Sequence, residues 1–495
     1  MDRNSIIGLT LIGLIIIGYS IYTQPSQEEI RASQQRRDSI AKIEEQKRTA
    51  KAVEMLPAIV DTVVHRSDSA NHEIEKQRLG DFAENVEGNE QLLTLENKLI
   101  KVIISSKGGK IKSAELKNYK TWDGKPLKLL NSDSSSFNLS FSAQNRIINT
   151  QELFFQAAGT TGSLKSVNLK LPAGEGRFIE YVYSLPEDSY LLNFKINVNG
   201  LQEVIASNAS YLNIDWRDVA LSNEKSIENE RTATTVYYRF SEEDVDNLTE
   251  TKDDKQSLKT KVKWIAFKQQ FFTAALIADN SFDSPVVETF TDHNSKTAVK
   301  NLSASFSLPY ERTSNQSYGM RFYLGPNHYQ TLKKIDDLNL EKLIPLGWGI
   351  FGWVNRFLVI PTFNYLNSFN LNYGLIILIL TIFVRIIILP LTYGSFKSQA
   401  KMKILQPEMA ELNEKFKEDP MKKQQEVMAI YKKAGVNPMG GCIPGLLQLP
   451  ILIAMFRFFP SSIELRQQSF YGPPIYQRTI QYLICPLKFL FMEAT

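Results

Sequence analysis

The sequence predicts an α-helical, multi-span membrane protein with a large extracytoplasmic all-β domain. Three observations predict this fold class. Three long apolar runs lie near the start and in the last third of the chain, a long middle region alternates apolar and polar residues, and a lysine-rich segment separates the last two runs. Apolar runs of this length are typical of membrane spans, and the alternation is typical of half-buried strands.

The first element is the apolar run over residues 5–22. It carries no charge over roughly 18 residues, which is marginally long enough to cross a bilayer. A cleaved signal peptide is the alternative, but TQPSQEE follows the run instead of a small-residue cleavage site. We therefore expect a membrane anchor over residues 1–23. A charged spacer, either a solvated helix or a flexible segment, is expected over residues 24–90.

The middle region, residues 91–335, is expected to form a periplasmic β-sandwich domain. The run YLLNFKINVNG places apolar residues at every second position and closes on Asn199 and Gly200, which is a hairpin signal. The runs RFIEYVYSL, SFNLSFS and GMRFYLG repeat the alternation, and KGGK separates two strands. A sandwich of antiparallel strands follows.

No catalytic, cofactor or metal site is predicted, and we expect a protein that is not an enzyme. The middle region contains no nucleophile elbow, phosphate loop or paired-carboxylate motif. Its four histidines do not have metal-ligand spacing; they are His65, His72, His293 and His328. A net charge of +4 gives no reason to expect a nucleic-acid partner.

An interfacial amphipathic helix is expected over residues 340–370. Apolar residues recur there at steps of three and four, at Leu343, Leu346, Ile350, Trp353 and Phe357. Two tryptophans just before a membrane span suit the headgroup boundary, where indole rings are favoured. The alternative is a core helix of the preceding domain.

The second span, residues 371–395, carries Arg385 in the middle of an aliphatic run. An arginine near the centre of a span costs about 2.5–3.5 kcal/mol on insertion scales. The surrounding Leu, Ile, Val and Phe residues offset that cost, so the helix can insert with its charge. A structural arginine, which snorkels or pairs with a neighbouring helix, is the alternative to a functional one.

A helical hairpin is expected over residues 396–438, followed by a third span over residues 439–460. Apolar residues spaced three and four apart indicate a coiled-coil-like seam, at Met402, Leu405, Met409, Leu412 and Phe416. Asp419 is a plausible N-cap for the second helix, with Pro420 at its first position. The third span contains Pro444 and Pro450, which neighbouring membrane helices can tolerate.

The excess of lysines in the hairpin predicts how the chain is oriented in the membrane. The hairpin carries nine lysines against six acidic residues, so it should face the cytoplasm. Two spans precede it, which places the amino terminus in the cytoplasm and the β-domain outside. We expect a multi-pass protein of the bacterial inner membrane.

Two stretches resemble the YidC/Oxa/Alb family of membrane protein insertases, in the form found in Gram-negative bacteria. They are TIFVRIIILPLTYGSFKSQAKMKILQPEM and KAGVNPMGGCIPGLLQLPI, with weaker likeness in WIAFKQQFFTAALI and YLGPNHY. The resemblance implies a membrane protein insertase and chaperone that works through a polar intramembrane groove without nucleotide hydrolysis. Arg385 matches the groove arginine, and Thr381 and Gln448 match groove-lining polar positions.

The resemblance also implies partners and a more specific β fold. The partners are nascent membrane proteins, the ribosome, the Sec translocon and the lipid bilayer, with no direct nucleic-acid partner, and the outer domain is a supersandwich. A membrane-anchored periplasmic carbohydrate-binding protein and a transporter remain the alternative functions.

The carboxyl end departs from the family pattern. Residues 461–495 are expected to form an outer loop and an atypical tail, because YGPPIYQRTIQYLICPLKFLFMEAT replaces the further spans that the family has. We expect a chain truncated or frameshifted near Phe470. The alternative is a genuine short variant.

Overall fold

The computed structural model describes residues 75–131, 133, 135–143, 145–158, 165–242, 244–335, 338–416, 420–435 and 443–468. The predicted anchor, most of the spacer, the Asp419 cap and the tail after Phe470 lie outside these residues. The end of the spacer is described as the 3₁₀ helix η1 (Gly80–Asn85), whose Phe82 and Ala83 are buried in the main core. Packed structure therefore begins before residue 91.

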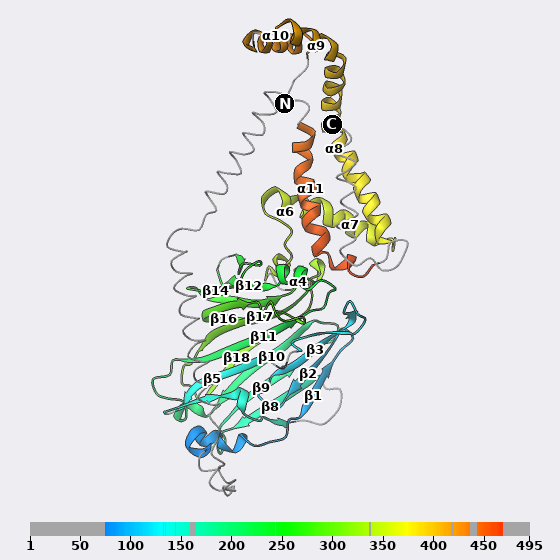
Figure 1. Ribbon diagram of the computed structural model, residues 1–495. Coiled ribbons are helices and arrows are strands. Elements are labelled where there is room, and N and C mark those ends of the chain that lie inside the picture. The colour runs from blue at the N-terminus through cyan, green and yellow to red at the C-terminus, as the bar shows by residue number, and fades with distance from the viewer. Residues whose placement is uncertain are drawn as a thin grey trace, which may run out of the picture. The chain divides into compact units, whose positions relative to one another are not determined.

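The β-domain consists of two antiparallel sheets (Figure 1). The smaller sheet has the order β1 (Leu92–Glu96), β2 (Ile100–Ser105), β3 (Ile111–Lys120), β4 (Pro126–Leu129). The main path of the larger sheet is β6 (Arg146–Asn149), β5 (Ser136–Ala143), β11 (Tyr211–Leu221), β17 (Ala298–Pro309), β16 (Phe272–Phe290), β18 (Asn315–Pro326), β10 (Leu191–Asn199), β9 (Phe178–Ser184), β8 (Ser166–Pro172), β7 (Gln156–Ala158). Four further strands lie beside this path: β12 (Thr235–Phe240), β13 (Val245–Asn247), β14 (Asp254–Ser257), β15 (Val262–Lys268).

The long strand β16 divides the larger sheet into two layers. Its first part, Phe272 to Ala278, pairs with β18 and β15, and its last part, Asp283 to Phe290, pairs with β17 and β14. Between the two parts the register shifts at Ser284, whose φ of 48° is left-handed. A bulge of this kind bends a strand, so β16 passes from one layer to the other.

Aromatic side chains fill the space between the layers. Trp216 of β11 stacks on Phe267 of β15 with ring centroids 3.8 Å apart. Phe137 of β5 meets the edge of Phe194 of β10 at 5.5 Å. Because each pair joins strands of different layers, the predicted sandwich of antiparallel strands is confirmed.

The strand predicted from YLLNFKINVNG is confirmed as β10, but its hairpin is wrong. The residues at every second position of β10 are buried, as the alternation predicts. Gly200 does adopt a left-handed φ of 69°, yet the chain then enters the 3₁₀ helix η3 (Leu201–Glu203). The strand partners of β10 are β9 and β18, because burial of its apolar face in the centre of the sheet outweighs the local turn signal.

The helical part follows the β-domain in the sequence. Its elements are α5 (Tyr329–Lys333), η4 (Leu340–Leu343), α6 (Gly349–Val354), the π-helical segment η5 (Asn355–Val359), α7 (Ile360–Asn367), α8 (Tyr373–Ile404), α9 (Gln406–Lys415), α10 (Pro420–Lys433), α11 (Ile443–Ser461) and η7 (Ile463–Leu465). Within the β-domain lie the helix α4 (Ile227–Ala233) and the 3₁₀ turn η2 (Thr150–Glu152). Helices α8 and α11 contact each other, and both contact the α6–α7 region (Figure 1).

A second core cluster joins strand residues to helical residues. Trp264 of β15 is fully buried, and its Nε1 donates a hydrogen bond to the carbonyl of Leu338 at 2.8 Å. Tyr323 of β18 belongs to the same cluster as Val359 and Phe458. One continuous apolar core therefore connects one edge of the β-domain to α6, α7 and α11.

The predicted interfacial helix is shorter than expected. Leu343 and Leu346 are buried in the second cluster, and the helix begins only at Gly349. Pro345 and Gly347, which has a φ of 95°, interrupt a continuous helix. Ile350, Trp353 and Phe357 remain exposed, so the predicted apolar face is split between a buried loop and an exposed helix.

The predicted coiled-coil-like seam is also interrupted. Helix α8 ends at Ile404, and α9 begins at Gln406 with Pro407 in its first turn. Proline lacks the N–H that a continuous helix would direct at the carbonyl of Lys403. The seam residues stay half-buried, but they lie on two helices, and α9 and α10 form the helical hairpin.

Candidate functional site

Helix α8 presents two different faces along its length. Ile376, Leu380, Val384, Ile388 and Thr392 recur at every fourth position and are buried. Other positions of this helix expose large apolar side chains, namely Leu375, Leu378, Ile382, Phe383, Ile386, Ile387 and Leu389. The buried stripe faces the neighbouring helices, and an exposed aliphatic face of this size is stable only against an apolar surrounding such as lipid.

The first part of α8 is long and apolar enough to cross a bilayer. Residues 373–390 have a mean hydropathy of 2.5, and among the described residues this is the one helix that is long and apolar enough to cross a membrane. The side chain of Asn372 caps its start by accepting a hydrogen bond from the Gly374 N–H at 2.9 Å. Lys401 and Lys403 lie in its last turn, where cations interact favourably with the helix dipole.

Arg385 lies on the exposed side of α8, next to the buried stripe. It follows Tyr373 by 12 residues, which at 1.5 Å per residue is about 18 Å along the helix. In a hydrocarbon core of about 30 Å this depth is far from either boundary. Neither α8 nor α11 contains an Asp or Glu.

Thr381 lies on the same helix as this arginine, whereas Gln448 lies on a different helix. Thr381 is one turn earlier on the same face of α8, and its hydroxyl donates to the carbonyl of Ile377 at 2.8 Å. Its hydroxyl oxygen still has lone pairs that can accept a hydrogen bond. Gln448 is half-buried on the adjacent helix α11. Two of the three predicted residues thus share one helix face, and the third lies on the helix beside it.

Asn355 is a polar residue of the helical part that sequence analysis missed. Its side chain is fully buried in the π-helical segment η5, and its Nδ2 donates to the carbonyls of Leu346 at 2.7 Å and Ala454 at 2.8 Å. The second bond attaches η5 to α11 across 99 positions of sequence. A lone amide in the apolar run IFGWVNRFLVIP was the signal available in the sequence.

A buried ion pair attaches the segment that follows α11 to the β-domain. Arg466 donates from Nε to Glu224 at 2.6 Å and from Nη2 to the carbonyl of Lys120 at 2.6 Å. Its guanidinium also lies over the ring of Phe272 at 5.1 Å. Burial raises the pKa of Glu224 to about 6, while Arg466 acts in the opposite direction. The segment after α11 is therefore fixed to the strands by charge as well as by apolar contact.

A second polar contact reinforces this attachment. His328, directly after β18, lies with its Nε2 3.4 Å from Glu464, and its Nδ1 contacts the Thr331 hydroxyl at 2.8 Å. His328 therefore has polar neighbours on both ring nitrogens. Within the part of the chain that the structure describes, no three His, Cys, Asp or Glu side chains gather as metal ligands would.

Two family models match the chain, one over the β-domain and the helices that directly follow it, and the other over the rest of the helical part. The model described as the YidC periplasmic domain matches residues 92–360. The model described as the 60Kd inner membrane protein matches residues 365–493, which include Thr381, Arg385 and Gln448.

Curated relatives match over almost the whole chain. The membrane protein insertase YidC of Bacteroides fragilis is 38% identical over 477 residues, which cover 95% of this chain and 75% of that protein. The protein of the same name from Phocaeicola vulgatus is 39% identical over 485 residues, covering 96% and 76%. That of Porphyromonas gingivalis is 35% identical over 489 residues, covering 95% and 76%. The chain thus spans about three quarters of the length of these relatives.

Solved structures show weaker likeness. A crystal structure of an active YidC insertase with its first transmembrane domain resolved is 15% identical, covers 74% of this chain and 71% of its own, and has a TM-score of 0.28. A galactose mutarotase related enzyme from Lactobacillus acidophilus is 10% identical, covers 47% of this chain and 97% of its own, and has a TM-score of 0.31. At these scores we draw no conclusion from either likeness.

Proposed function

Because this chain belongs to the YidC family of membrane protein insertases, we propose that it inserts and folds inner-membrane proteins through a polar groove between α8 and α11. Arg385 supplies the cation of this groove, and Thr381 and Gln448 supply polar contacts beside it. The observation that carries the proposal is the position of Arg385, about 18 Å into the one described helix that is long and apolar enough to cross a membrane, and on the exposed face of that helix.

The physical role of the arginine follows from its surroundings. In a medium of low dielectric constant a fixed cation attracts water and acidic side chains much more strongly than it does in bulk water. It therefore lowers the barrier to carrying a hydrophilic segment of a client across the bilayer. The client's own apolar span then provides the driving force as it moves sideways into lipid, so nucleotide hydrolysis is not needed.

The proposed arrangement in the membrane has three spans. They are the apolar run over residues 5–22, helix α8 and helix α11. The lysine-rich hairpin of α9 and α10 faces the cytoplasm, where it offers a positive surface to the ribosome and the incoming client. The β-domain lies in the periplasm, and the Sec translocon is a second partner at the membrane.

The groove is tested by an insertion assay in proteoliposomes. The client is a single-span protein whose translocated segment is acidic, and a client with a neutral segment serves for comparison. Arg385→Ala should reduce insertion of the acidic client by about tenfold, with a smaller effect on the neutral client. Arg385→Lys should retain part of the activity because the cation remains without the guanidinium fork.

The control variant is Arg356→Ala, which removes an exposed arginine of η5 outside the groove. It should insert both clients as the unsubstituted protein does. Equal insertion by all four proteins at matched membrane levels would show that Arg385 is structural, and the groove proposal would then be wrong.

A further inference from the structure

A cavity of about 550 Å³ lies between the β-domain and the end of α11. Its polar side is formed by α4, by Lys268 at the end of β15 and by Gln270 in the turn that follows. Its apolar side is formed by Ile453, Phe456 and Phe459 of α11. The cavity therefore combines a polar end with a wall provided by a helix that we propose to cross the membrane.

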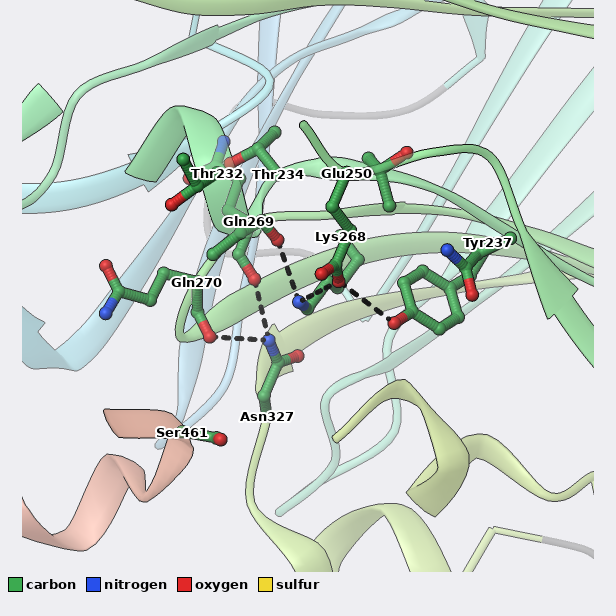
Figure 2. A network of polar contacts seen from close by, with 12 residues as sticks. Thr232, Thr234, Tyr237, Glu250, Lys268, Gln269, Gln270, Asn327 and Ser461 are labelled. Atoms are coloured by element: carbon green, nitrogen blue, oxygen red, sulfur yellow. Dashed lines mark hydrogen bonds and ion pairs between the residues drawn. The ribbon is translucent and has the colours of Figure 1, made fainter. Parts of the chain in front are cut away.

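The polar end is built around a buried cation. Lys268 is 2% exposed, and its Nζ donates to the carbonyl of Ala233 at 2.8 Å and lies 3.4 Å from Glu250. Tyr237 donates its hydroxyl to the same carboxylate at 3.2 Å. Figure 2 shows this network, with Thr232 near it and Ser461, at the end of α11, across from it.

Charge at the cavity is positive. Lys268 and Arg457 line it against the single carboxylate of Glu250. Lys300, which also contacts Glu250, is 2% exposed. Its Nζ donates to the carbonyls of Thr234 and Glu250 at 2.8 and 2.7 Å. Burial lowers the pKa of both lysines, which means that their positive charges are held at a cost in free energy. A bound anion would offset that cost.

The apolar wall continues out of the cavity along α11. Phe456 is 46% exposed, and Leu452 and Leu449 are exposed one and two turns earlier on the same side of the helix. These side chains form an uninterrupted apolar track that leads from the cavity along the helix. A ligand that matches this site has an anionic head and a long apolar chain.

We propose that the cavity binds one phospholipid, with its phosphate against Lys268 and Arg457 and with one acyl chain along Phe456, Leu452 and Leu449. This site is separate from the Arg385 groove, although it rests on the proposal that α11 crosses the membrane. The bound lipid bridges the β-domain and α11, and the Arg466–Glu224 ion pair joins the β-domain to the segment that follows α11.

Native mass spectrometry of the full chain in detergent tests the proposal. The delipidated protein is titrated with dioleoyl phosphatidylglycerol, with dioleoyl phosphatidylethanolamine, with dioleoylglycerol, which lacks the phosphate, and with inorganic phosphate. We expect one phospholipid per chain to be retained, and at least about tenfold weaker retention of dioleoylglycerol, because it cannot pair with the cations. Retention of inorganic phosphate but of no phospholipid would overturn the assignment. Retention of dioleoylglycerol as strong as that of the two phospholipids would also overturn it.

Two variants locate the site. Arg457→Gln changes an exposed side chain and should weaken phospholipid retention by about tenfold. Leu452→Asn should weaken it through the acyl chain and leave the binding of inorganic phosphate unchanged. The matched control is Arg356→Gln, an exposed arginine outside the cavity, which should retain the lipid as the unsubstituted protein does.

The result does not depend on the insertion assay. If Arg385→Ala abolishes insertion while phospholipid retention persists, both proposals stand. If retention is the same in Arg457→Gln, Leu452→Asn and the control, the lipid site is wrong, whatever the insertion assay gives.

Discussion

The β-domain exposes few of its large apolar side chains, whereas the helices α6 to α11 expose many of theirs. Of the 26 large hydrophobic side chains that are exposed in the described chain, five belong to the β-domain, at Leu92, Trp122, Ile147, Tyr211 and Phe290. The other 21 lie between Trp348 and Phe456. The β-domain buries its aromatic residues between two layers, whereas the helices bury one stripe and expose the rest.

This difference shows that the two regions are built for different solvents. In water, exposed apolar surface costs about 25 cal/mol per Å², so a soluble domain places it inside. In lipid the same surface costs nothing, and helices associate instead through close packing and a few polar contacts. Asn355 and Arg466 are such contacts, one within the helical part and one at its junction with the strands.

The largest effect that tests this comparison is expected when one tryptophan in each region is replaced by alanine. Trp264→Ala removes a fully buried ring and its hydrogen bond to Leu338, and should lower the free energy of unfolding by about 3–5 kcal/mol. Trp353→Ala removes a ring that is 60% exposed and should lower it by less than about 1 kcal/mol in detergent. Thermal unfolding followed by circular dichroism measures both. Equal losses would mean that the two rings share one kind of environment.

The pH dependence of stability tests the buried carboxylates of the β-domain. Burial raises the pKa of Glu230 to about 7 from its ordinary value of about 4.5, against hydrogen bonds from Ser222 and Asn223. Between these two pH values the folded state holds a proton that the unfolded state has lost. The contribution of Glu230 to the free energy of unfolding therefore falls by about 3 kcal/mol as pH rises from about 4.5 to about 7, and it stays constant at higher pH.

Glu230→Gln should remove this part of the pH dependence. The free energy of unfolding, measured at pH 5 and pH 8, should decrease less in the variant than in the unsubstituted protein. Because Asp218 and Glu224, whose pKa values burial also raises, remain in both proteins, the difference between them isolates Glu230. Identical pH profiles would show that this carboxylate is solvated in solution.

A smaller loss is expected from Asn355→Leu in the helical part. The change leaves the carbonyls of Leu346 and Ala454 without their donor, which should cost about 2 kcal/mol. Hydrogen exchange at residues 443–461 should increase, because α11 loses its bond to η5. Asn364→Leu on α7, a half-buried amide, is the control and should leave the exchange unchanged. Unaltered exchange in both variants would show that apolar packing alone holds α11.

The smallest effect is expected at the exposed face of α6 and η5. Phe357 is 61% exposed and contacts Trp353 with ring centroids 5.5 Å apart. Phe357→Ser should change the free energy of unfolding in detergent by no more than about 0.5 kcal/mol. In bilayers of brominated lipid it should reduce the quenching of tryptophan fluorescence, because the helix is less firmly inserted. A loss of stability above about 1 kcal/mol would place this face in a protein core.

Local sequence determined which parts of this protein are strands, which are apolar helices and where the isolated charge lies. Period-two alternation predicted β10, because successive side chains of a strand point to opposite faces. An unbroken aliphatic run predicted α8, and the helical repeat put Thr381 and Arg385 on one face. These properties depend on residues a few positions apart, so they can be read without knowing the fold.

Tertiary structure alone decided which distant residues meet. Asn199 and Gly200 signal a hairpin locally, but the place of β10 between β9 and β18 overrides them. Arg466 pairs with Glu224, which lies 242 positions away in the sequence, and Asn355 donates a hydrogen bond to Ala454, which lies 99 positions away. Such pairs are selected by the burial of whole layers and helices against one another. The residue pattern within one segment does not show which distant segment it will contact. The free energy that brings two segments together comes from the apolar surface around the paired residues.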